Sequence, residues 1–379
     1  MALDSFFKRI EAHYSAQLPF VSYRKPNSLK LNAILQNTDE IYVTTDFKEK
    51  GFVFSPFDDN DDTILTPIEF STLITCSEEL PSIENQEEEE KNIQNGSVLI
   101  APDARFHHLD LIKKGIVAIK DKTLDKVVLS RQETVRLSTS NPIPILKNLL
   151  NTYASAFVYC WYHPKIGLWL GATPETLLKI EGKRFSMMAL AGTQDYKGTL
   201  DVKWEEKERQ EQQFVTDFIV QHLKPSVEQF RLSAVETVKA GNLVHLKTMI
   251  TAELKPETLL RHVISDLHPT PAVCGVPKNK SKQFILKHEP YNREFYTGFL
   301  GELNLDISVS PRSGRRNVEN RAYAMKKRST QLYVNLRCMQ LKNDTAILYM
   351  GGGITKDSNP EQEWQETVSK SMVIKNALL

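Results

Sequence analysis

Four strand-like segments follow one another between residues 156 and 193, and only short breaks of the type Pro-Lys, Pro-Glu and Gly-Lys separate them. A parallel strand pair needs a crossover connection of about a dozen residues or more. Connections as short as these allow only antiparallel neighbours. We therefore predict an antiparallel meander over this stretch.

Further strand-like segments lie on both sides of it, at residues 40–47, 51–57, 97–102, 126–137, 235–254, 294–304, 331–341 and 346–353. Helical spacing occurs over 105–122, over 203–223 and near the C-terminus. Because strands outnumber the interspersed helices, we predict an α+β fold of large antiparallel β-sheets packed together, with helices on the outside. Near residue 104 the residue pattern changes from short strand-like segments to helical spacing. We therefore divide the chain into an N-terminal lobe (1–103) that packs on the core and a core (104–379).

The composition fits a buried core, with 41% hydrophobic and 25% charged residues. The net charge is +1, and nucleic-acid binders usually carry a basic stripe that is missing here. We therefore expect no nucleic-acid partner. The densest basic segment, residues 312–316, is interpreted as a solvated loop, and the acidic segment 84–96 as a mobile surface loop.

The chain also gives no sign of disulfides, zinc or a membrane. Its cysteines are far apart and form no CxxC pair: Cys76, Cys160, Cys274 and Cys338. The N-terminus lacks the apolar core of a signal peptide. The longest notable uncharged run, 148–164, contains Asn, Thr, Ser, Tyr and His and is shorter than the ~20 apolar residues of a membrane span. We expect a cytoplasmic protein and, without an exposed amphipathic stripe, a monomer.

The helix predicted over 203–223 places acids on its apolar side. At about 100° per residue, Glu208 and Glu211 share the face of Val215, Phe218 and Ile219. The opposite face is polar. A carboxylate on a buried face is costly unless it is paired, protonated or bound to a cation.

The C-terminal helix repeats this pattern, with Glu363, Glu366 and Lys370 on the side of Val373 and Ile374. Four carboxylates without Cys or His are typical ligands of Mg²⁺. The alternative is that these acids begin the two helices and interact favourably with the helix dipoles.

Two glycine-containing segments lie near predicted strand ends. Gly351, Gly352 and Gly353 end one strand, and "LAGT" (190–193) ends another. Backbone N–H groups without a neighbouring Cβ can approach an anion closely. The alternative interpretation is an ordinary turn.

Nine segments in this order resemble the chorismate-utilising enzymes, which include isochorismate synthase, salicylate synthase, anthranilate synthase component I and aminodeoxychorismate synthase. The segments are "KVVLSR", "GATPETLL", "LAGT", "KERQEQ", "HLKT", "LHPTPAVCGVPK", "REFYTGFLGE", "YVNLRCMQL" and "GGGITKDSNPEQEWQET". The resemblance covers roughly residues 104–376, and the N-terminal lobe is variable in the family. It implies the fold of that family and chorismate as the substrate.

The resemblance also implies roles for single residues. Glu211 and Glu366 would bind Mg²⁺, with Glu208 and Glu363 assisting. Lys370 and the N–H groups of the glycine-containing turns would hold the ring carboxylate, and those turn residues are Gly192, Thr193, Gly351, Gly352 and Gly353. Arg337 and Tyr296 would hold the enolpyruvyl carboxylate. One departure is Gln212, where relatives commonly have His.

The branch of the family depends on a few positions. Lys126 matches the water-using members, and Ala191 replaces the nucleophilic lysine of aminodeoxychorismate synthases. Ala272 and His245, in "HLKT", match the pattern of isochorismate synthases. The resemblance thus implies the conversion of chorismate to isochorismate, the first step of menaquinone and siderophore synthesis.

In this reaction water adds at C2 of the ring and the C4 hydroxyl leaves. Lys126 would deprotonate the water, and Glu175 would protonate the leaving hydroxyl. The alternative for Lys126 is a strand-edge lysine that discourages aggregation. The alternative for Glu175 is a turn residue after Pro174.

Three other functions remain open from sequence. Salicylate synthase shares nearly all of these residues and also eliminates pyruvate. Anthranilate synthase component I fits less well because of Lys126 and Ala272. A non-catalytic binder of chorismate-like metabolites is the alternative outside enzymes.

Overall fold

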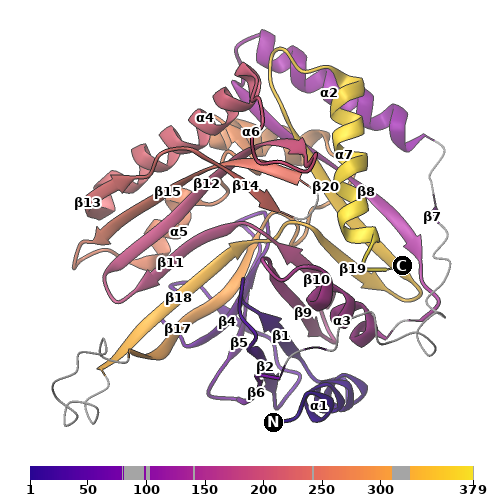
Figure 1. The fold of residues 1–379 in the computed structure, drawn as a ribbon, viewed down its shortest axis with the longest axis vertical. Helices are drawn as coiled ribbons and strands as arrows, with labels where there is room; N and C mark the ends of the chain where they lie inside the picture. Colours follow the sequence, from indigo (N-terminus) through magenta and orange to yellow (C-terminus); the bar gives the residue numbers. More distant parts are fainter. Residues whose placement is uncertain are drawn as a thin grey trace.

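The chain forms two large antiparallel β-sheets that face each other, with helices on their outer sides (Figure 1). This α+β architecture confirms the predicted fold class. The computed structural model describes residues 1–78, 80, 98–99, 103–139, 141–240, 243–309 and 325–378. The predicted loops at 84–96 and 312–316 lie outside the described residues.

The first sheet has the strand order β16-β8-β20-β19-β10-β9-β1-β2-β6, and β7 also pairs with β8. In chain order its strands are β1 (Phe20–Arg24), β2 (Leu31–Gln36), β6 (Ser71–Cys76), β7 (Val98–Leu99), β8 (Lys126–Arg136), β9 (Phe157–His163), β10 (Gly167–Thr173), β16 (Gly275–Val276), β19 (Cys338–Lys342) and β20 (Thr345–Ile354).

The second sheet has the order β13-β15-β12-β11-β18-β17-β4-β5-β3, and β14 also pairs with β15. Its strands are β3 (Tyr42–Thr44), β4 (Gly51–Ser55), β5 (Thr63–Pro67), β11 (Thr176–Glu181), β12 (Arg184–Asp195), β13 (Val227–Leu232), β14 (Glu236–Ala240), β15 (Leu243–Leu254), β17 (Phe299–Val309) and β18 (Met325–Val334).

The predicted single meander over 156–193 is wrong in one respect. β9 pairs with β10 and β11 pairs with β12, but β10 belongs to the first sheet and β11 to the second. The chain crosses between the sheets at Pro174 and Glu175. A two-residue break excludes a parallel crossover within one sheet, but it permits a step onto the facing sheet. This crossing places Glu175 between the two layers.

An aromatic layer fills the space between the sheets. Phe157 of the first sheet stacks on Tyr333 of the second, with ring centroids 4.0 Å apart. The N-terminal residues take part in this layer through Tyr23 and Phe52. Strands of residues 1–103 therefore extend both sheets, which is how this part of the chain packs on the remainder.

The helices cover the outer faces of the sheets. They are α1 (Leu3–Ser15), α2 (Ala104–Lys120), α3 (Pro142–Thr152), α4 (Glu206–Leu223), the short 3₁₀ helix η3 (Lys224–Ser226), α5 (Leu260–Leu267), α6 (Lys278–His288) and α7 (Pro360–Lys375). α4 packs on β12, and α7 packs on β20 (Figure 1). The apolar stripes predicted for these two helices are buried, whereas Gln210, Gln213 and Asp217 are exposed.

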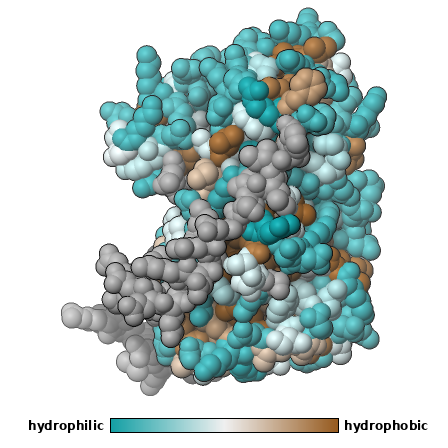
Figure 2. Space-filling model, turned by 90° about the vertical axis from the view of Figure 1, so that its right-hand side faces the viewer, coloured by the Kyte–Doolittle hydropathy of each residue, from teal (hydrophilic) through white to brown (hydrophobic). Residues whose placement is uncertain are grey.

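The surface is mainly hydrophilic on the face shown in Figure 2, where apolar atoms form separate small areas. All four cysteines are buried and free. Among the described residues, no helix is both long and apolar enough to cross a membrane.

Candidate active site

One pocket collects thirteen of the sixteen residues singled out from the sequence. Its empty space is about 850 Å³, a volume that includes the open solvent at its mouth. The thirteen residues are Lys126, Glu175, Gly192, Thr193, Glu211, His245, Ala272, Tyr296, Arg337, Gly351, Gly353, Glu366 and Lys370. They come from both sheets, from α4 and α7, and from the connections between them.

Lys126 and Glu175 lie in this pocket and are nearly inaccessible, with 2% and 5% of their surface exposed. Lys126 begins β8, and Glu175 lies at the crossing between the sheets. The backbone of Glu175 is fixed because its carbonyl oxygen accepts from the Val334 N–H at 3.0 Å. Burial raises the pKa of Glu175 to about 8, although the positive charges of Lys126 and Arg337 oppose this shift. At neutral pH Glu175 is therefore a proton donor.

Arg337 and His245 form a second fixed unit. An Arg337 N–H donates to Nε2 of His245 at 3.0 Å, so this nitrogen must be an acceptor. The proton of the neutral ring then lies on Nδ1, which is 3.1 Å from the carbonyl oxygen of Gly192. Burial and the charges of Arg337 and Lys370 lower the pKa of His245 to about 3. His245 is thus a neutral residue that orients Arg337, and both of its nitrogens are engaged.

Arg337 itself remains a cation at neutral pH, since burial lowers its pKa only to about 10. Its backbone has a positive φ of 48°. Lys370 also lies at the pocket and donates to the carbonyl oxygen of Gly351 at 2.9 Å. Arg337 and Lys370 are suited to a ligand with more than one carboxylate.

Each carboxylate of the predicted metal set other than Glu208 has a lysine partner. The distances are 3.9 Å for Lys126–Glu211, 2.5 Å for Lys207–Glu363 and 2.7 Å for Lys370–Glu366. Sequence reasoning missed Lys207, because its partner lies 156 positions away and no local pattern connects them. The pairs explain how acids can occupy the inward faces of two helices in the structure.

The residues present are chemically suited to Mg²⁺. Glu363 has only 1% of its side chain exposed, and within the described part of the chain its Oε2 has no hydrogen-bond partner. This oxygen lies 3.5 Å from where a Cβ of Gly352 would be, and Oε1 of Glu366 lies 4.0 Å from the same point. Carboxylate oxygens are the donors that Mg²⁺ prefers. Within the described ranges, however, no three His, Cys, Asp or Glu side chains already form a metal-binding group.

The absence of a side chain at Gly353 makes this arrangement possible. A Cβ there would lie 2.4 Å from Oε1 of Glu211 and 3.0 Å from Cε of Lys126. Gly192, at the other predicted turn, has a φ of 72°, which favours glycine. Both glycines therefore have a geometric role beside the pocket.

Glu208, Gly352 and Glu363 are the three predicted residues that do not line the pocket. Glu208 takes part in a capping box at the start of α4, where its Oε2 accepts from the backbone N–H of Glu205 at 3.0 Å. This is the helix-starting role that the sequence left open for these acids.

Gln212, the departure from the family pattern, is buried behind the pocket. Its Nε2 donates to the carbonyl oxygen of Ala189 at 3.1 Å and to Oγ1 of Thr248 at 3.0 Å. Gln212 thereby connects α4 to β12 and β15.

The fold and the pocket define a protein with two antiparallel sheets and a pocket that is lined by a buried acid, a buried lysine, Arg337 and Lys370. The family model described as "chorismate binding enzyme" matches residues 67–322, and a second model of the same description matches 322–376. The chain belongs to the chorismate-binding enzyme family.

Among its relatives are two isochorismate synthases. MenF of Escherichia coli is 27% identical over 71% of this chain and 59% of the relative, and DhbC of Bacillus subtilis is 27% identical over 70% and 66%. The chain thus spans about three fifths to two thirds of the length of these relatives. The crystal structure of the putative isochorismate synthase DhbC from Bacillus anthracis superimposes with a TM-score of 0.76 at 22% identity, covering 98% of this chain and 99% of the other. This similarity supports the same fold.

Proposed function

We propose that this protein is an isochorismate synthase that converts chorismate to isochorismate. The observation that carries the proposal is the placement of Lys126 and Glu175 in one pocket with Arg337 and Lys370. The isochorismate synthases among its relatives support the same assignment.

In the proposed reaction one water molecule enters and one leaves. Lys126 accepts a proton from the entering water as its oxygen bonds to C2 of the ring. Both double bonds of the ring shift, the bond between C4 and its hydroxyl breaks, and Glu175 donates the proton with which the hydroxyl departs as water. Proton transfer through solvent then returns both residues to their starting states. Arg337 and Lys370 bind the two carboxylates and hold the ring between the acid and the base.

We further propose that Mg²⁺ binds to Glu211 and Glu366, with Glu363 assisting. When bound, the ion supplies positive charge beside the ring carboxylate. Lys370 is already on this side of the pocket through its pair with Glu366. Lys207 pairs with Glu363 at 2.5 Å and balances the charge of that carboxylate.

Product analysis after incubation with chorismate and Mg²⁺ tests the function directly. Isochorismate as the sole product supports the proposal. Salicylate together with pyruvate would identify a salicylate synthase, and an aminated product in the presence of ammonia would identify an anthranilate synthase. Binding of chorismate without turnover would identify a non-catalytic binder.

The pH profile is the first quantitative prediction. The pKa of Glu175 is raised to about 8, so its acid form predominates below that pH and is lost above it. We expect kcat to fall about tenfold per pH unit above about pH 8, because a general acid must be protonated to act. Measuring kcat at constant ionic strength into the alkaline range checks this. A rate that stays constant there would exclude Glu175 as the acid.

Substrate recognition gives the second prediction. Arg337→Lys keeps the charge but loses the planar fork that binds a carboxylate with two hydrogen bonds. We expect the Kd for chorismate to increase about 10–100-fold, since a charge-assisted hydrogen bond contributes about 1.5–3 kcal/mol. Titration calorimetry measures this value, and Arg136→Lys, at an exposed arginine, is the matched control. Unchanged binding in Arg337→Lys would show that this residue does not contact the substrate.

A further inference from the structure

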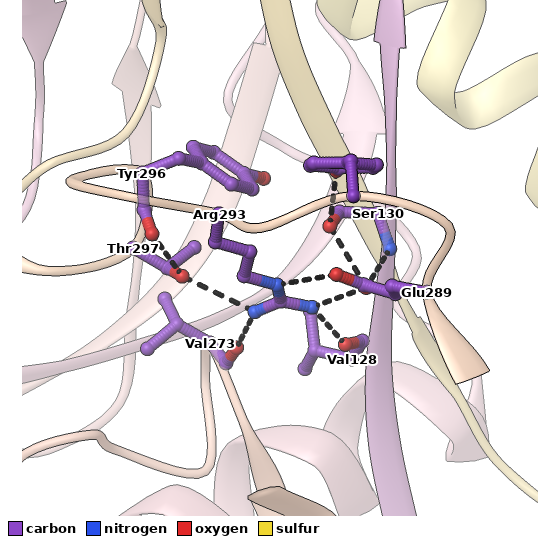
Figure 3. Close-up of polar contacts among 8 residues, drawn as sticks. Val128, Ser130, Val273, Glu289, Arg293, Tyr296 and Thr297 are labelled. Carbon is purple, nitrogen blue, oxygen red and sulfur yellow. Dashed lines mark hydrogen bonds and ion pairs between the residues drawn. The ribbon is translucent and has the colours of Figure 1, made fainter. Parts of the chain in front are cut away.

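A buried arginine lies directly behind the wall of the pocket. Arg293 has 1% of its side chain exposed, and it does not itself line the pocket. Its guanidinium group forms an ion pair with Glu289, with one N–H 2.6 Å from Oε1 and Nε 2.8 Å from Oε2 (Figure 3). The proposed reaction gives this pair no role.

The other N–H groups of Arg293 reach three separate segments of the chain. They donate to the carbonyl oxygen of Val128 at 2.7 Å, to that of Val273 at 3.0 Å and to Oγ1 of Thr297 at 3.1 Å (Figure 3). All five guanidinium N–H donors are therefore used. A lysine could not make the same set, because its ammonium group has three donors and no planar fork.

Each of these segments carries a residue of the proposed site. Val128 is two residues from Lys126 in β8, Val273 follows Ala272, and Thr297 follows Tyr296. Val128, Val273 and Thr297 also line the pocket themselves. Arg293 thus joins three parts of the wall that are far apart in the sequence.

Glu289 holds β8 at a second point. Its Oε1 accepts from both the backbone N–H and the hydroxyl of Ser130, each at 2.8 Å (Figure 3). The strand that begins with Lys126 is therefore bound to the Glu289–Arg293 pair at Val128 and at Ser130. Neither contact is part of the pairing of β8 with β20.

A buried ion pair is weak evidence for stability, since apolar replacement of both partners is often neutral or stabilising. The arrangement is therefore better explained by the positions that it gives to the neighbouring residues of the pocket. We propose that Glu289 and Arg293 are positioning residues, which set Lys126 relative to Ala272 and Tyr296. This inference rests on the proposed function, because Lys126 is its point of action.

The expected consequence is a loss of turnover that exceeds the loss of binding. Displacement of a catalytic group by about 1 Å can lower a rate about 10²-fold. The hydrogen bonds described for the pair go to Ser130, Val128, Val273 and Thr297, whereas Arg337 and Lys370 are the charged groups assigned to the substrate. We expect Arg293→Lys to lower kcat about 10²-fold and to raise the Kd for chorismate less than tenfold.

Two further variants distinguish an effect on the position of Lys126 from an effect on the stability of the fold. Glu289→Met combined with Arg293→Met removes both charges and keeps side chains of moderate volume, so it should remain folded but have the same low kcat. Glu302→Gln is the matched control. Glu302 is buried between the sheets, pairs with Lys25 at 2.5 Å and accepts from Tyr23 at 2.7 Å, but lies outside the pocket. It should lower Tm and leave kcat unchanged.

The measurements are kcat, the Kd for chorismate, Tm and a crystal structure of the double variant. A folded double variant with wild-type kcat, or with Lys126, Ala272 and Tyr296 in their wild-type positions, would overturn the inference. If the wild-type protein forms no isochorismate, the proposed function fails. The crystal structure then still decides whether the pair positions Lys126.

Discussion

Lys126→Gln is expected to lower the rate of isochorismate formation about 10²–10⁴-fold, which is the usual size of a general-base contribution. Glutamine is polar and of similar length, but it cannot accept a proton from water at neutral pH. Arg337 and Lys370 carry the substrate contacts in the proposed mechanism. Chorismate should therefore still bind, and titration calorimetry against the variant checks this.

Two comparisons make this experiment specific. Lys282→Gln removes another largely buried lysine, which pairs with Asp58 at 2.7 Å and lies outside the pocket, so its rate should remain at the wild-type level. Ammonia provides the second comparison. Because ammonia is a stronger nucleophile than water, Lys126→Gln should form traces of an amino product while water addition stays lost.

A Lys126→Gln variant with the wild-type rate would assign the base to another residue. His245 is the nearest alternative by type, but the structure makes it a poor one. Its Nε2 accepts from Arg337, its Nδ1 lies beside the Gly192 carbonyl oxygen, and its pKa is lowered to about 3. Among the described residues at the pocket, this leaves Lys126 as the group best placed to take a proton.

The sequence best predicts those features that depend on a regular spacing of residues close together in the chain. The spacing of Glu211 with Val215 and Ile219, and of Glu363 with Val373 and Ile374, depends only on the helical repeat. These residues therefore fall on the inward faces of α4 and α7 in the structure. The antiparallel sheets could likewise be predicted, because connection length alone excludes parallel pairing.

The assignment of strands to sheets could not be predicted in this way. β10 and β11 are separated by two residues, and nothing in their alternation distinguishes a hairpin from a step onto the facing sheet. The same holds for the Glu289–Arg293 pair and for Lys207. Their partners lie far away in the sequence, so only the three-dimensional packing brings them together.

Removal of the proposed metal is the second experiment with a large expected effect. EDTA should abolish turnover, and Mg²⁺ should restore it. Glu211→Gln and Glu366→Gln keep the shape of each side chain but remove a negatively charged oxygen donor. We expect each to lower kcat about 10³-fold or more, since a metal supplies several kcal/mol and each 1.36 kcal/mol is tenfold in rate. Titration calorimetry should show weaker Mg²⁺ binding in both variants.

Glu206→Gln is the matched control, since Glu206 is another glutamate of α4, in its first turn, but is exposed. It should keep both Mg²⁺ binding and turnover. Full activity in chelator, or in either Glu211→Gln or Glu366→Gln, would refute the assignment of the metal.

The lysine pairs determine what the chelator should do to the fold. Without a metal ion, Glu211, Glu363 and Glu366 would repel one another, but Lys207 and Lys370 already pair with Glu363 and Glu366. The chelated protein should therefore stay folded, and saturating Mg²⁺ should stabilise it by only about 3 kcal/mol at one hundred times its Kd. Thermal unfolding with and without EDTA measures this difference. Collapse of the fold in EDTA would instead show that the ion holds the structure together and that the lysine pairs do not compensate for its loss.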